Sequence, residues 1–153
     1  MNQFFETSDN KFVNLREVAS IAFEETNNYK IIFNMNYGVS LKHNKNKMIS
    51  DYVYSIYKDR EQFDDAFFYL MKLVEEYQWI KAKQPRIINP DHISFVTSDV
   101  HNNRIILNIA STVSFHGDKD ARTSDFVYIN CSDEEEFKEK MLYIRESLEN
   151  LVL

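Results

Sequence analysis

The sequence predicts an α+β fold in which a β-β-β-β-α unit occurs twice, so that two antiparallel sheets each carry one C-terminal helix. A shift of 74 residues places 28–77 over 102–151 without a gap, and 16 of these 50 positions are identical. Chance alone would give about three identities at ordinary residue frequencies. In each copy, alternating apolar residues come first and helically spaced apolar residues follow. We therefore expect the units 1–84 and 85–153 to pack with pseudo-two-fold symmetry into one compact domain.

The first unit is expected to contain four strands. Strands at 18–25 and 29–36 are predicted because both segments are rich in apolar residues at alternating positions and flank an Asn-Asn turn signal. Gly38 predicts a tight reversal into a third strand at 39–43, and a fourth strand is expected at 51–57. The face of the second strand expected to meet the helix carries Ile31, Phe33 and Met35.

A helix at 59–81 is predicted to end the first unit. Asp59 and Gln62 have the spacing of a capping box, in which the first residue caps the helix and the residue three positions on reaches back to it. Apolar residues then recur at helical spacing. They are Phe63, Phe67, Leu70, Val74 and Tyr77.

The second unit repeats this order, with strands predicted at 93–97, 104–110, 112–116 and 125–130 and a helix at 133–151. Ser132 is expected to cap this helix, and Glu135 is expected to complete the capping box. The apolar stripe of the helix is Phe137, Met141, Ile144, Leu148 and Leu151. The segment 78–90 contains both prolines and has no apolar periodicity, so we expect it to be the linker between the units.

The composition argues against an enzyme. With 2 Gly in 153 residues, the chain cannot build the glycine-rich loops that bind phosphates or the sharp turn that carries a catalytic serine. The four histidines lack metal-ligand spacing, and Cys131 is the only cysteine. We therefore expect no catalytic residues, no metal and no cofactor.

The location of the protein is also predicted from what the sequence lacks. Its first residues do not combine a basic region with an apolar stretch, as a secretory signal does. No apolar run approaches the roughly 18 residues that a membrane helix needs. We expect a cytoplasmic protein that does not engage a membrane.

The strand faces turned away from the helices carry similar side chains in both units. Each has a cation, an apolar residue and an amide on the second strand and a tyrosine on the fourth, and the first unit adds a basic loop. The predicted binding face consists of Lys30, Asn34, Lys42, Lys45, Lys47, Tyr54, Arg104, Asn108 and Tyr128. The register of the fourth strands stays open, because Val53 and Val127 fit a core as well as the tyrosines beside them.

Two kinds of partner fit this face. On a protein surface, its apolar members would pack against the partner and its polar members would form the rim. On single-stranded nucleic acid, the rings would stack with bases while the cations follow the phosphates. The net charge of −6 favours the protein, whereas the net charge of +4 over 27–60 favours the nucleic acid. We expect a non-catalytic module that binds a protein surface, such as a phage- or plasmid-type inhibitor or adaptor, with self-association as a further option.

The order of the predicted elements resembles that of PUR repeats and of the related PC4 and Whirly proteins. Those proteins bind single-stranded nucleic acid on their sheets. The resemblance concerns topology alone and assigns no binding residues, because fold order does not determine function. It implies nucleic-acid binding on the sheet as the alternative to a protein partner.

Overall fold

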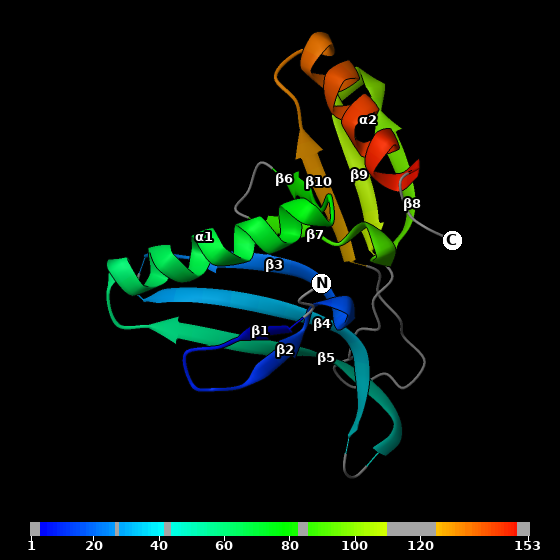
Figure 1. The fold of residues 1–153 in the computed structure, drawn as a ribbon. Helices are drawn as coiled ribbons and strands as arrows, with labels where there is room; N and C mark the ends of the chain where they lie inside the picture. Colours follow the sequence, from blue (N-terminus) through cyan, green and yellow to red (C-terminus); the bar gives the residue numbers. More distant parts are fainter. Residues whose placement is uncertain (1–3, 27, 42–43, 83–85, 110–124, 150–153) are drawn as a thin grey trace.

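The computed structural model describes residues 4–26, 28–41, 44–82, 86–109 and 125–149, with the backbone alone for the strand residues within 36–51 and for Asp125 (Figure 1). The first half contains, in order, β1 (Phe4–Glu6), β2 (Phe12–Asn14), the one-turn 3-10 helix η1 (Leu15–Glu17), β3 (Val18–Glu24), β4 (Tyr29–Leu41), β5 (Asn44–Tyr57) and α1 (Arg60–Glu76). The second half contains β6 (Ile80–Ala82), β7 (Arg86–Ile88), η2 (Pro90–His92), β8 (Ile93–Asp99), η3 (Val100–Asn102), β9 (Arg104–Ile109), β10 (Asp125–Asn130) and α2 (Glu134–Glu149).

The described strands form three sheets, and each of their pairs is antiparallel. A five-stranded sheet has the order β5-β4-β3-β7-β6, a three-stranded sheet has the order β10-β9-β8, and β1 pairs with β2. Figure 1 shows α1 running along the five-stranded sheet and α2 running along the three-stranded sheet. The predicted α+β class, with several antiparallel sheets and two helices, is therefore confirmed.

The larger core lies between α1 and the five-stranded sheet. Alternation along β4 directs Ile31 and Phe33 toward the helix, where they join the buried Phe63 and Leu70. The hairpin β1–β2 adds Phe5, whose ring centroid lies 5.3 Å from that of Phe33. This packing fixes which faces of β3, β4 and β5 are turned away from the helix.

Helix α1 starts where it was expected but ends earlier. The side chain of Asp59 accepts a hydrogen bond from the backbone N–H of Gln62 at 2.9 Å, as predicted for the cap. The predicted end at residue 81 is wrong, because Gln78 adopts a left-handed conformation with φ 56. The N–H groups of Gln78 and Trp79 then bond to the carbonyls of Glu75 and Val74, and this Schellman motif ends the helix at Glu76.

The first unit has three long strands where four were predicted. Gly38 does not reverse the chain but lies inside β4, which continues to Leu41 and pairs with β5 throughout. The register of this pairing shifts between Met35 and Gly38, as at a β-bulge. A glycine serves a bulge as well as a turn, and this explains why the sequence signal was misread. The strand predicted at 112–116 lies outside the described residues.

The segment expected to be a linker forms the hairpin β6–β7 instead. β7 pairs with β3, so the hairpin extends the five-stranded sheet from its far edge. Successive residues of β7 face different cores: Ile87 belongs to the core under α1, whereas Ile88 and Ile80 belong to the core under α2. Residues 83–85 lie outside the described part, so the proposed boundary between 84 and 85 stays a prediction.

The smaller core lies between α2 and the three-stranded sheet. Ile105 and Leu107 from β9 meet Ile144 from the helix. The cap of α2 differs by one residue from the prediction: the side chain of Asp133, not that of Ser132, accepts from a first-turn N–H, at 2.8 Å. The carboxylate of Glu136, not that of Glu135, reaches back to the backbone N–H of Ser132. An aspartate next to a serine offers two competing caps, and the pattern alone does not choose between them.

The two halves repeat their element order but not their pairing. Among the described elements, each half runs from a short hairpin through a 3-10 turn and three strands to a helix, and the side chains of Asn14 and Asn89 cap the matching turns. However, β7 pairs with β3, whereas β2 pairs only with β1 among the described strands. The pseudo-two-fold packing that we expected is therefore not established by the described sheets.

Candidate functional site

The outward face of the five-stranded sheet carries exposed aromatic and apolar side chains. In the register of β4 and β5, Ile32 lies opposite Tyr54 and Asn34 lies opposite Tyr52. Directly opposed residues share a face, so these side chains point away from α1. Tyr54 is 46% exposed, whereas Val53 packs against the core under α1. In the first unit, the strand whose register the sequence left open therefore has its valine toward the core and its tyrosine on the outward face.

The outward face of the three-stranded sheet has the same composition. Ile106 lies opposite Tyr128 and Asn108 lies opposite Phe126 in the register of β9 and β10. Tyr128 is 48% exposed, and Val127 is buried in the core under α2. β8 contributes a further exposed ring to this face, because Phe95 lies opposite Asn108. The same pairs of residue types therefore face outward in both halves of the chain.

The predicted face residues differ in how accessible they are. Lys30 is partly buried and lies 3.9 Å from the carboxylate of Glu24. Asn34 and Asn108 are buried. We had expected both amides to be available to a partner, but their exposed fractions of 6% and 5% leave them little accessible surface. The rings of Tyr54 and Tyr128 are the most accessible of the predicted face residues whose side chains are described.

The basic loop is only partly described. Lys42 lies outside the described residues, and Lys45 and Lys47 belong to the part of β5 described by its backbone alone. Their role in binding stays a prediction.

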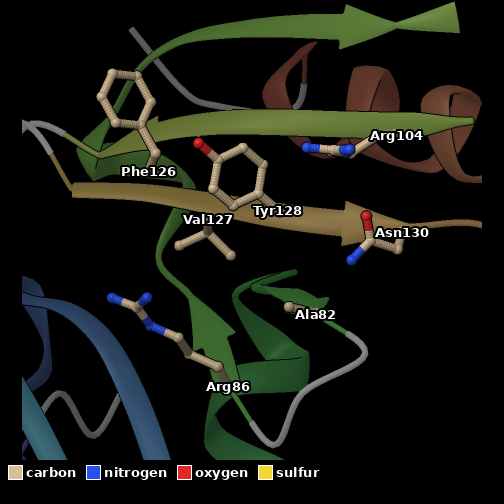
Figure 2. Close-up of a pocket in the computed structure, with 7 residues that line it drawn as sticks. All are labelled: Ala82, Arg86, Arg104, Phe126, Val127, Tyr128 and Asn130. Atoms are coloured by element: carbon tan, nitrogen blue, oxygen red, sulfur yellow. The ribbon is translucent and has the colours of Figure 1, made fainter. Parts of the chain in front are cut away.

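A pocket of about 350 Å³ lies between β10 and the β6–β7 hairpin (Figure 2). Its described lining consists of Ala82, Arg86, Arg104, Phe126, Val127, Tyr128 and Asn130. The guanidinium carbon of Arg104 lies 5.5 Å from the ring centroid of Tyr128, within the range of a cation–π contact. Sequence analysis missed Arg86 because it lies in the segment interpreted as a linker, and only the pairing of β7 with β3 brings it here.

Each arginine of the pocket is held by its surroundings. Arg86 donates from Nη2 and Nε to the hydroxyl of Ser20 on β3, at 3.1 and 3.4 Å. The Nε of Arg104 is buried and has no hydrogen-bond partner in the described part of the chain. Arg104 also lies opposite Asp99 in the register of β8 and β9. The amide of Asn102 donates to Asp99 at 2.7 Å and chiefly lowers the pKa of that carboxyl, and Arg104 contributes to the same shift.

This arrangement is suited to binding. Exposed rings on a sheet can stack with planar groups, and the neighbouring guanidinium groups can bind anions. Within residues 4–149 as far as they are described, there is no group of three or more His, Cys, Asp or Glu placed to hold a metal ion. Likewise, no helix of the described part has the length and apolar character needed to cross a membrane.

Of three comparisons with known proteins, the comparison with solved structures found a similar chain. No protein-family model matches the chain, and no curated protein matches its sequence. The chain is similar to a structure described as the LytTr DNA-binding domain of a response regulator from Bacillus cereus, at 15% identity and a TM-score of 0.47, over 95% of this chain and 94% of that one.

The comparison corrects our expectation about the partner. We had expected a protein surface, but the similar structure is described as a DNA-binding domain, which agrees with the nucleic-acid alternative. A likeness at this level of identity carries no residue-level detail, so we base the functional proposal on the described side chains.

Proposed function

We propose that the protein binds single-stranded nucleic acid on the outward faces of its two sheets and catalyses no reaction. The observation that carries this proposal is the exposure of Tyr54 and Tyr128 at matching positions of the two sheets. Large aromatic side chains on strands usually contribute to a core, and here the smaller valines do so instead. A ring that stands free on a sheet can stack with a base of any sequence.

Cations beside the rings supply the second requirement. Lys30 lies on the same face as Ile32 and its partner Tyr54, and Arg104 covers part of Tyr128. A guanidinium stacked on a ring can bind a phosphate or present its own plane to a base. The net charge of −6 reduces general attraction to nucleic acid, so binding is expected to depend on these local groups.

We further infer that the two halves are tandem copies of one unit and that each contributes a platform to the same function. Residues 74 positions apart support this: Ile32 faces Tyr54 across one sheet, and Ile106 faces Tyr128 across the other. Two platforms would contact a longer stretch of strand than one, because each stacked ring accommodates about one base.

A titration of labelled single-stranded DNA and RNA at two salt concentrations tests the proposal. We expect binding that weakens steeply with salt, because phosphate contacts release counterions. Tyr54→Ala and Tyr128→Ala are each expected to weaken binding by about 1–3 kcal/mol, which is roughly 5- to 150-fold. Phe68→Ala is the matched control, because this ring is 63% exposed but lies on α1, away from the outward faces.

Three results would contradict the proposal. They are no binding at low salt, an equal loss in the Phe68→Ala control, and tighter binding of a duplex than of either of its strands. The last result would indicate groove recognition, in which stacking on an open sheet has no part. Thermal melting of each variant checks that it is folded, and little change is expected because all three rings are exposed.

A further inference from the structure

Three polar side chains lie in a row across the outward face of the three-stranded sheet. Arg104 on β9 has Asp99 opposite it on β8 and Asn130 opposite it on β10. The next row on the same face, two residues along each strand, contains Tyr128. Figure 2 shows the guanidinium group of Arg104 beside the ring of Tyr128, with Asn130 on the adjacent strand. A charged pair and an amide, which we call the polar row, thus adjoin an exposed ring.

The charged pair of the polar row keeps groups that a ligand can use. The amide of Asn102 donates to Asp99 at 2.7 Å, and the guanidinium carbon of Arg104 lies 5.5 Å from the ring centroid of Tyr128. The Nε of Arg104 lacks an acceptor in the described part of the chain. A carboxylate has about four acceptor sites and a guanidinium has five N–H donors, so these contacts use only part of either group.

The composition of the polar row favours an uncharged ligand over a phosphate. The amide of Asn102 and, to a smaller extent, Arg104 hold the pKa of Asp99 below its ordinary 3.8, so this carboxyl is ionised at neutral pH. An ionised carboxylate beside the guanidinium repels a phosphate. A neutral group that presents acceptors to Arg104 and donors to Asp99 meets no such repulsion, and the edges of unstacked bases are groups of this kind.

Guanine is the base whose edges match both charged side chains. Its O6 and N7 are neighbouring acceptors, and one guanidinium can donate to both. Its N1–H and its N2 amino group are neighbouring donors, and one carboxylate can accept from both. Adenine, cytosine and thymine each present a single donor group. Guanine alone among the four bases can therefore form a two-bond pair with an arginine and another with an aspartate.

The corresponding row of the five-stranded sheet has different chemistry. There Lys30 on β4 lies opposite Glu24 on β3 and Ile56 on β5. The Nζ of Lys30 lies 3.9 Å from the carboxylate of Glu24. An ammonium group has no planar fork, and an isoleucine stands where the other sheet has an amide. Both sheets thus place a cation near an exposed ring, but the three-stranded sheet has the groups that can distinguish one base from another.

We propose that the polar row selects guanine in a bound single strand, with Arg104 donating to O6 and N7, Asp99 accepting from N1–H and the N2 amino group, and the base lying against Tyr128. The inference rests on the proposed function and deepens it, because it names the base that one of the two sheets recognises. The five-stranded sheet then binds the neighbouring part of the strand without regard to its sequence.

Fluorescence anisotropy with labelled thymidine oligonucleotides that contain one guanine, adenine or cytosine tests the inference. We expect the wild-type protein to bind the guanine strand roughly 5- to 150-fold more tightly than the all-thymine strand, which is the discrimination given by one bidentate pair. Replacement of the guanine by 7-deazaguanine, which lacks N7, or by hypoxanthine, which lacks the N2 amino group, should each reduce this preference. These analogue measurements use the wild-type protein, so they test the inference independently of the stability of any variant.

Substitutions assign each edge of the base to a side chain. Arg104→Gln should reduce the guanine preference, and 7-deazaguanine should then bind this variant as well as guanine does. Asp99→Asn should also reduce the preference, and hypoxanthine should then bind as well as guanine does. Arg104→Lys keeps the charge but not the planar fork, so it should lose most of the preference.

Lys30→Gln is the matched control, because it removes a cation from the equivalent row of the other sheet. It is expected to weaken all strands by a similar factor and to leave the guanine preference unchanged. Strand binding without a guanine preference, a preference for another base, or an equal loss of preference in Lys30→Gln would overturn the inference and leave the proposed function standing. Failure of every strand to bind would overturn both.

Discussion

Phe63 is the residue through which the packing of α1 on the five-stranded sheet can be tested. It is 2% exposed, and its ring centroid lies 5.7 to 6.5 Å from those of Phe23, Tyr29, Tyr57 and Phe67. Truncation of a buried phenylalanine to alanine costs about 3–5 kcal/mol. Each aromatic pair adds about 0.5–1.5 kcal/mol beyond burial. The measured range for truncation already contains the loss of such pairs, and because Phe63→Ala removes four of them, we expect a value near its upper end, a fall of about 4–5 kcal/mol in the free energy of unfolding.

Urea and thermal denaturation followed by circular dichroism measure this loss. For a chain of this size each kcal/mol lowers the Tm by about 2–4 °C, so the Tm of Phe63→Ala should fall by roughly 10–20 °C. Phe63→Leu keeps an apolar side chain and should lose less. Phe68→Ala, on the exposed side of the same helix, should cost no more than about 1 kcal/mol. Equal losses at positions 63 and 68 would refute the orientation of α1.

Two further predictions concern the helix caps and the hairpin β1–β2. Asp59→Ala and Asp133→Ala each remove a carboxylate that accepts a first-turn N–H, and each should lower the free energy of unfolding by about 1 kcal/mol in urea denaturation. Asparagine at either position should restore most of the loss, and failure to do so would contradict the capping role. Thr7→Val should raise the pKa of Asp9 in an NMR titration, because the hydroxyl of Thr7 donates to Asp9 at 2.6 Å and is the main cause of a pKa below the ordinary 3.8. A lowered pKa stabilises the fold above the pKa of the unfolded chain and ceases to do so as pH falls through the folded pKa, so the variant should lose less stability on acidification; an unchanged pKa would contradict the assignment.

Alternation predicted the long strands and their faces well. Ile31 and Phe33 alternate with polar or outward residues over a whole strand, and burial of one face leaves that strand a single workable register. Because the second half repeats the sequence pattern of the first, the same alternation also predicted the faces of β9 and β10. Helix starts were predicted to within one residue, because a cap is a local interaction between positions three apart.

The short hairpins were not predictable in the same way. β6 and β7 have three residues each, too few to show a period, and β7 is buried on both faces, so Ile87 and Ile88 do not alternate with polar residues. Besides β6, β7 pairs with β3, which lies more than 60 residues away in the chain. Such a pairing follows from tertiary packing and leaves no local signal.

The sequence likewise predicted one part of the candidate site and missed another. The outward rings follow from strand periodicity, whereas periodicity alone does not show that Asn34 and Asn108, on the same faces, are buried. Arg86 and Arg104 line the same pocket because one half of the chain packs on the other. The sequence around either residue gives no sign of this proximity. Alternation along the strands therefore predicted which side chains face outward, whereas the position of the pocket follows from the tertiary packing of the two halves.

The hairpin β6–β7 makes the two halves mutually dependent. It spans the predicted boundary between the two units, adds two strands to the sheet of the first, and packs into both cores through Ile87 and Ile88. A chain cut after α1 would lose an edge of its sheet, and the remainder would keep a hairpin without a strand to join. Thermal unfolding should therefore be a single cooperative transition. A partner that binds one half should also sense the folding or unfolding of the other half.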